Sequence, residues 1–203
     1  KILNITSKDF LYVSHIFPYK NIVRLINAFT IYKKEYISNV KLYIVGKIMD
    51  TAYFNKLKNL IYKNDLSSEI IFTGPAIKNE LRLAYSSCKL FIFPSLCESS
   101  GYSLIEAMSC GAPILASDKT AIPDTCKNAA EYFDGYDEKD LLIKLINISK
   151  NNSRLQIMKS NSLRRSSEMI DYEISTNIFL DIVKSKLSKW LFSFPNDKDI
   201  SFR

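Results

Sequence analysis

The sequence predicts an α/β fold built on a doubly wound parallel sheet, with helices alone at the C-terminal end. Short apolar runs alternate with helical patterns from residue 10 to about residue 150. These runs have no polar face, which is typical of strands covered by helices on both sides of a sheet. After Asp134 the pattern becomes helical only. Alternating strands and helices indicate βαβ units and a Rossmann-like sheet.

Six runs have the features of buried strands. Each is short, largely apolar and bounded by Gly, Pro or polar residues. In chain order they are Phe10–Ser14, Lys41–Val45, Ile70–Thr73, Leu90–Phe93, Ile114–Ala116 and Glu131–Phe133.

Amphipathic stretches lie between these runs. Apolar residues share one helical face within 22–36, 54–61, 78–86 and 102–109. The last of these stretches ends at Gly111 with Pro113 beyond it, which is a typical signal for the end of a helix.

Three further helices are expected after the last strand, and no strand separates them. They are Glu138–Lys150, Ser153–Ser167 and Glu173–Phe192. We therefore expect residues 1–192 to form one domain and the largely polar residues 193–203 to form a flexible tail.

Composition and charge argue against a membrane-spanning protein and against a nucleic-acid-binding protein. Apolar residues make up 47% of the 203 residues, and no apolar run approaches the roughly 18 residues of a membrane span. The net charge is +7, and residues 139–190 hold ten Lys or Arg against five Asp or Glu. A solvated helix face is the favoured explanation of this excess, and we expect no nucleic-acid partner because aromatic and basic residues do not alternate. Peripheral membrane contact stays open.

The cysteine pattern favours a cytoplasmic protein with reduced thiols. No pair of the four cysteines has C-x-x-C spacing, and the chain has one His. Cys97 and Cys110 are interpreted as buried, inert thiols. Asp197 and Asp199 have the spacing of a metal-binding D-x-D motif but lie in the expected tail, so we interpret them as solvated charge and expect no metal site.

The segment after the run Leu90–Phe93 carries the strongest functional signal. Ligands of open α/β sheets bind at the carboxyl ends of the strands. Here the small-residue turn Ser99-Ser100-Gly101 opens a helix, whose free N–H groups and dipole favour an anion such as phosphate. Glu98 and Glu106 flank this turn, and carboxylates accept paired hydrogen bonds from sugar hydroxyls. Spacing alone leaves open that they are ordinary loop and helix acids.

This segment resembles the E-x₇-E signature of the retaining glycosyltransferases of family 4, which have the GT-B fold. The signature runs from Glu98 to Glu106 and continues to Pro113. Colinear blocks agree with the family at Tyr12–Asn21, Leu42–Gly46, Phe72–Gly74, Phe93–Ser95 and Ala121–Asp124. The resemblance covers residues 10 to about 150 and implies that the chain is the C-terminal, donor-binding half of such an enzyme.

The resemblance also implies a role for individual residues. Glu106 would bind the ribose hydroxyls, and Glu98 would meet the hydroxyls of the donor sugar. Lys20 would neutralise the diphosphate leaving group, a kind of electrostatic stabilisation that is often large in catalysis. Glu98 and Lys20 are thus the expected catalytic residues. Further donor contacts are expected from the helix start at Gly101, Tyr102 and Ser103 and from the loop containing Pro75 and Ile77.

Three departures from the family pattern bear on this site. Ser14-His15 stands where the family commonly has an arginine, so His15 is a candidate phosphate contact with only partial charge at neutral pH. Packed or solvent-facing imidazole is the alternative for it. Ser99-Ser100 replaces the commoner Gly-Phe, and Gly46 stands alone where a Gly-x-Gly is frequent.

The expected function is transfer of a sugar from a nucleoside diphosphate donor to an acceptor, with retention at the anomeric carbon and without cofactor or metal. The acceptor, a glycan or lipid-linked glycan, would bind an N-terminal domain that this chain lacks. Two other functions stay open. A nucleotide-binding regulatory module would need the anion site but not both acids, and a basic interaction module would use the C-terminal helices.

Overall fold

The structure is a computed structural model of the 203-residue chain, and it describes residues 3–36, 39–169 and 179–187. The chain divides into two compact units, residues 1–167 and residues 168–203. In the second unit residues 179–187 are helical. The rest of the helix expected at Glu173–Phe192 and the expected tail 193–203 lie outside the described residues. The expectation of a single domain over 1–192 stays a prediction.

The first unit is built on one parallel sheet of six strands. Its strands are β1 (Phe10–Val13), β2 (Leu42–Val45), β3 (Ile70–Gly74), β4 (Leu90–Phe93), β5 (Ile114–Ser117) and β6 (Ala130–Phe133). Their order across the sheet is β3-β2-β1-β4-β5-β6. All five neighbouring pairs are parallel. The predicted doubly wound, Rossmann-like sheet is confirmed, and each strand end lies within one residue of its predicted position.

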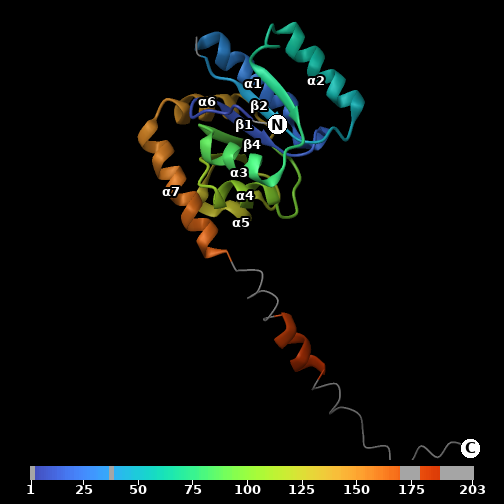
Figure 1. The fold of residues 1–203 in the computed structure, drawn as a ribbon, viewed down its shortest axis with the longest axis vertical. Coiled ribbons are helices and arrows are strands. Elements are labelled where there is room, and N and C mark those ends of the chain that lie inside the picture. The colour runs from blue at the N-terminus through green and yellow to red at the C-terminus, as the bar shows by residue number, and fades with distance from the viewer. Residues whose placement is uncertain (1–2, 37–38, 170–178, 188–203) are drawn as a thin grey trace, which may run out of the picture. The chain divides into compact units, whose positions relative to one another are not determined.

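Helices cover both faces of this sheet. They are α1 (Ile22–Glu35), α2 (Thr51–Lys63), α3 (Lys78–Ser87), α4 (Tyr102–Ser109), α5 (Ile122–Cys126), α6 (Glu138–Ser149) and α7 (Asn152–Glu168). Helix α1 packs against α2 and α6, whereas α4 packs against α3 and α5. Figure 1 shows α1 and α6 on one side of the strands and α3, α4 and α5 on the other.

Burial explains why this pattern of residues forms this sheet. Every residue of β1, β2, β4 and β5 is buried, whereas the edge strands β3 and β6 contain partly exposed residues. The four inner strands therefore need apolar side chains on both faces, as their sequences have. Aromatic side chains complete the core between β1 and α1, where the Phe10 ring lies edge-on to Phe29 and Tyr32.

The chain order changes direction between β1 and β4. Strands β1, β2 and β3 extend the sheet one way, and β4, β5 and β6 extend it the other way. Connections from β1 and β4 therefore leave toward opposite faces and open a crevice at the carboxyl ends of these two strands. Such a switch point is where open α/β sheets bind ligands.

Candidate active site

The two expected catalytic residues meet at this switch point. Lys20 ends the short 3₁₀ turn η1 (Pro18–Lys20) after β1, and Glu98 lies in the loop after β4. The ammonium of Lys20 lies 2.5 Å from Oε1 of Glu98, and the two side chains are only 7% and 12% exposed. The same ammonium lies 4.9 Å from the ring centroid of Tyr19. A salt bridge this shielded from water holds both groups in place, because either charge would be costly to bury alone.

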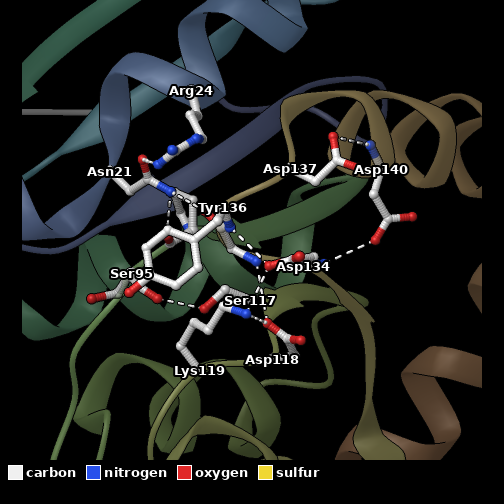
Figure 2. A network of polar contacts seen from close by, with 12 residues as sticks. Asn21, Arg24, Ser95, Ser117, Asp118, Lys119, Asp134, Tyr136, Asp137 and Asp140 are labelled. Carbon is white, nitrogen blue, oxygen red and sulfur yellow. Dashed lines mark hydrogen bonds and ion pairs between the residues drawn. The ribbon is translucent and has the colours of Figure 1, made fainter.

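Asn21 fixes the backbone that carries Lys20. It adopts a left-handed conformation (φ 60°) between η1 and α1 and is buried. Its side-chain amide donates hydrogen bonds to the carbonyl oxygens of Pro94 (3.1 Å) and Gly135 (2.9 Å). Arg24 donates to the Asn21 side-chain oxygen (2.9 Å), so both ends of the amide are used (Figure 2). The loop after β1 is thereby tied to the loops after β4 and β6.

A polar network below Asn21 orders the ends of β5 and β6. The Lys119 ammonium pairs with Asp118 (2.9 Å) and Asp134 (2.7 Å), and Figure 2 shows it beneath the Tyr136 ring. The hydrogen bond from Lys119 lowers the pKa of the Asp134 carboxyl. Asp118 in turn accepts from the backbone N–H of Gly135 (3.2 Å), which is the residue whose carbonyl receives Asn21.

The backbone around Glu98 is also fixed by hydrogen bonds. Its N–H donates to the hydroxyl of Thr120 (2.9 Å), a residue with left-handed backbone (φ 51°) after β5. Two positions earlier, the N–H of Leu96 donates to the carbonyl oxygen of Tyr19 (2.9 Å). The loops that carry Lys20 and Glu98 are therefore bonded to each other as well as joined by the salt bridge.

A cavity of about 240 Å³ lies at the carboxyl ends of β1, β2 and β3, beside α4. It is lined by Val13, Ser14, His15, Val45, Gly46, Lys47, Pro75, Ala76, Leu81, Ser103 and Glu106. Four expected donor-binding residues, His15, Pro75, Ser103 and Glu106, are thus brought together. The remaining expected residues, Lys20, Ile77, Glu98, Gly101 and Tyr102, are not among its lining residues.

Close approach of two strand ends shapes this cavity. A side chain at Gly46 would place its Cβ 1.8 Å from the backbone oxygen of Ser14. Gly46 also donates its N–H to the carbonyl oxygen of Gly74 (3.0 Å). Only glycine allows the ends of β1, β2 and β3 to converge in this way.

The start of α4 lies between the two acids. Gly101 is its N-cap with φ 63°, and no side chain caps the helix. The N–H groups of Tyr102 and Ser103 belong to the first turn, so they have no partner within the helix and are free to bind an anion. Glu106, one turn further, is exposed and reaches the cavity. Ile77 and Tyr102 are 68% and 78% exposed.

Sequence analysis missed one residue of the site, Tyr85. The pattern of residues 78–86 placed it on the apolar face of a helix and gave no sign of a contact with Glu106. Its hydroxyl donates to Oε2 of Glu106 (3.2 Å) although its side chain is buried. Burial raises the pKa of this hydroxyl far above its ordinary value, and the negative charge of Glu106 raises it further.

A second cavity, of about 690 Å³, lies elsewhere on the sheet. Its lining includes Asp9, Lys41 and Glu69, which directly precede β1, β2 and β3. It therefore opens at the amino ends of the strands and contains none of the expected site residues. The smaller cavity is the candidate ligand site, because ligand sites of this fold lie at the carboxyl ends of the strands.

The interpretation of Cys97 and Cys110 as buried is wrong. Cys97 is exposed and Cys110 is partly buried, whereas Cys88 and Cys126 are buried. The loop that positions Glu98 turns the Cys97 side chain outward. Burial raises the pKa of both Cys88 and Cys126 to about 12, so these two thiols stay protonated.

Within the described part of the chain, no group of three or more His, Cys, Asp or Glu side chains is arranged to hold a metal ion. Asp197 and Asp199 lie outside the described residues. Metal-independent binding stays a prediction. No helix among the described residues combines the length and apolar character needed to cross a bilayer.

Sequence comparison identifies related proteins. The mannosyltransferase WbdA of Escherichia coli is 33% identical over 132 residues, which cover 64% of this chain and 16% of that protein. The O-antigen chain mannosyltransferase RfbU of Salmonella typhimurium is 30% identical over 142 residues, covering 70% of this chain and 38% of that protein. The chain spans less than half the length of these relatives.

Solved structures share the fold. Anabaena HepE, in complex with UDP and glucose, superposes with a TM-score of 0.74 at 19% identity, over 87% of this chain and 48% of that protein. WaaG, a glycosyltransferase involved in lipopolysaccharide biosynthesis, gives a TM-score of 0.73 at 18% identity, over 87% of this chain and 47% of that protein.

The sequence model of one family, glycosyl transferases group 1, matches residues 2–165. This match covers the whole sheet, helices α1 to α6 and most of α7, including every residue of the candidate site. The chain therefore belongs to the family of glycosyl transferases group 1.

Proposed function

We propose that this chain is the donor-binding half of a retaining glycosyltransferase. It would bind a nucleoside diphosphate sugar at the carboxyl ends of its strands, for transfer of the sugar to a glycan or lipid-linked glycan held by another domain. The observation that carries this proposal is the shielded pair of Lys20 and Glu98 beside a cavity that contains Glu106. The family membership and the mannosyltransferase relatives support it.

The cavity suits the nucleoside. Apolar side chains line it from the end of β2, from the loop after β3 and from α3, namely Val45, Ala76 and Leu81. The carboxylate of Glu106 at its side can accept hydrogen bonds from both ribose hydroxyls, since an ionised carboxylate has two acceptor oxygens. Pro75 and the loop leading to Ile77 would flank the base.

The diphosphate would lie at the start of α4. Free N–H groups of Tyr102 and Ser103 would bind the distal phosphate, as helix N-termini bind anions. Lys20 would contact the diphosphate with its ammonium, and His15 would be a further phosphate contact. Lys20 already neutralises Glu98, so this acid can remain near a phosphate without strong repulsion. The ammonium would then bridge phosphate and carboxylate.

Glu98 would contact the hydroxyls of the donor sugar near its anomeric carbon. In the transfer step the bond from the anomeric carbon to the diphosphate oxygen breaks, and its electron pair goes to that oxygen. The acceptor oxygen forms the new bond on the same face, and its proton passes to the departing phosphate. Lys20 would stabilise the charge that develops on this phosphate.

Two measurements test the proposal. Calorimetry on the 203-residue chain should detect binding of at least one of UDP, GDP and ADP, and of a corresponding sugar nucleotide. In a protein that includes the acceptor half, NMR of the product should give the anomeric configuration of the donor. Inverted product would refute retention, and absence of all binding would refute the donor site. Peripheral membrane contact stays a separate prediction.

A further inference from the structure

Tyr85 is a buried tyrosine whose hydroxyl contacts a charged side chain of the candidate site, the carboxylate of Glu106. It lies on α3 with 1% of its surface exposed, and its ring packs edge-on against Phe91 of β4 at 5.2 Å between centroids. The ring is therefore held by the core. Its hydroxyl lies at the edge of the core, where it contacts α4.

The hydroxyl contacts a residue that lines the 240 Å³ cavity. It donates to Oε2 of Glu106 at 3.2 Å, and Glu106 and Ser103 both line the cavity. Ser103 and Glu106 are three positions apart and so lie on the same side of α4. The buried hydroxyl of Tyr85 therefore contacts the side of α4 that faces the cavity.

We infer that Tyr85 is a positioning residue, which holds the Glu106 carboxylate in the orientation that receives the ribose hydroxyls. This inference rests on the proposed function, because it assigns a supporting residue to the proposed ribose contact. Tyr85 does not touch the ligand itself. It acts by fixing one carboxylate oxygen, so that the other oxygen and the remaining lone pairs are directed toward the cavity.

The physical reason is the exposure of Glu106. A glutamate on the surface of a helix samples several rotamers, and ordering it on ligand binding costs free energy. A hydrogen bond from a rigid, buried phenol to the carboxylate restricts these rotamers before the ligand arrives, which is pre-organisation. The raised pKa of Tyr85 keeps its hydroxyl protonated, so it remains a donor throughout the neutral range.

The test uses Tyr85→Phe, which keeps the ring and removes only the hydroxyl. Tyr43→Phe is the matched control, because the buried Tyr43 also donates its hydroxyl, to the carbonyl oxygen of Asn4 at 3.0 Å, and lines the other cavity. Calorimetry would use whichever of UDP, GDP and ADP the unaltered chain binds most tightly, together with its 2′,3′-dideoxy analogue. Thermal denaturation would verify that both variants fold.

Tyr85→Phe should weaken binding of the ribose-containing probe by about five- to tenfold, within the range of an ordinary net hydrogen bond, because the lost bond acts on the ligand only through Glu106. Tyr43→Phe should leave it unchanged. For the dideoxy analogue, which lacks the hydroxyls that Glu106 receives, the loss caused by Tyr85→Phe should disappear. In a Glu106→Ala background, Tyr85→Phe should cause no further loss, because the two residues act as one unit.

Other outcomes separate this inference from the proposed function. If the unaltered chain binds the probe and Tyr85→Phe binds as tightly as Tyr43→Phe does, Tyr85 is only a core residue and the donor site stands. An equal loss with the dideoxy analogue would mean that Tyr85→Phe disturbs the whole cavity, which also overturns the positioning role. If none of the three probes binds to the unaltered chain, the donor site and the role of Tyr85 both fail.

Discussion

The side-chain amide of Asn21 lies 2.9 Å from the carbonyl oxygen of Gly135, a residue 114 positions further along the chain. Asn21 directly follows Lys20, and Gly135 follows β6 at the far edge of the sheet. The position of the lysine, which follows β1, thus depends on loops from the other half of the sheet, after β4 and β6. Mutations at Asn21 can separate this structural role from the chemistry of Lys20.

Asn21→Gly should destabilise the fold by about 2–4 kcal/mol, because the buried carbonyl oxygens of Pro94 and Gly135 both lose their donor. Asn21→Ala should cost about 1 kcal/mol more, since alanine is strained at φ 60°. Urea denaturation measures both values. Equal stability of the glycine variant and the unaltered chain would show that the amide contributes nothing.

Replacing Lys20 should destabilise the chain because Glu98 remains as a shielded, unpaired charge. Lys20→Met is expected to lower the free energy of unfolding by about 3–5 kcal/mol at neutral pH. The double variant Lys20→Met/Glu98→Gln should recover most of this loss, since no charge is then left without a partner. If the double variant is as unstable as the single one, loss of the lysine stem rather than of its charge explains the effect.

Lys20 should also discriminate between ligands. Lys20→Ala is expected to weaken binding of UDP, GDP or ADP far more than binding of the matching nucleoside, because its proposed partner is the diphosphate. The same pair of titrations on His15→Ala tests the departure from the family pattern at that position. An equal loss for nucleoside and diphosphate would indicate that Lys20 only shapes the site.

Glu106→Ala should weaken nucleoside diphosphate binding by about 1–3 kcal/mol, because the ribose hydroxyls lose their acceptor in the cavity. Calorimetry measures the loss, and an unchanged melting temperature would establish that the fold is intact. Unchanged affinity in a folded variant would refute the ribose role.

The fold could be predicted from the sequence because local pattern and burial agree. Each strand has apolar residues on both faces, and the amphipathic stretches between them have the helical period. The five-residue helix α5 (Ile122–Cys126) was not predicted, because it is too short to show a period and Pro123 lies in its first turn.

The sequence predicted the charged residues of the site but not the residues that hold them in position. Lys20, Glu98 and Glu106 stand out as charged residues after strands, whereas their supports do not. Tyr85 has the pattern of a core residue, and nothing local shows that its hydroxyl reaches Glu106 on another helix. Asn21 is in contact with residues more than 70 positions away, which a local pattern cannot reveal. Cys97 was placed wrongly for the same reason, since the direction of a loop side chain depends on distant partners such as Thr120.

Thiol labelling in the native protein should follow the observed burial. An aromatic disulfide reagent at pH 8 should modify the exposed Cys97 first and the partly buried Cys110 more slowly. Cys88 and Cys126 should react only after denaturant is added, because their pKa values of about 12 leave almost no thiolate at this pH. Mass spectrometry of peptides at intervals gives the order. Early labelling of Cys88 would contradict its burial.

Glu98→Gln, in a protein that includes the acceptor half, should reduce turnover much more than affinity for the donor. The carboxylate is proposed to contact the sugar near the carbon that becomes positively charged, and interactions that strengthen in the transition state act on kcat rather than on binding. The amide keeps the size of the side chain, so the loops joined by Leu96 and Tyr19 should stay in place. Steady-state kinetics measures turnover and donor affinity, and full turnover by Glu98→Gln would exclude its proposed role.

Addition of EDTA should leave donor binding by the 203-residue chain unchanged, since Lys20, His15 and the start of α4 would supply the positive charge that a metal provides elsewhere. Calorimetry of donor binding with and without chelator measures this effect. A requirement for Mg²⁺ or Mn²⁺ in donor binding would show that lysine and helix do not suffice.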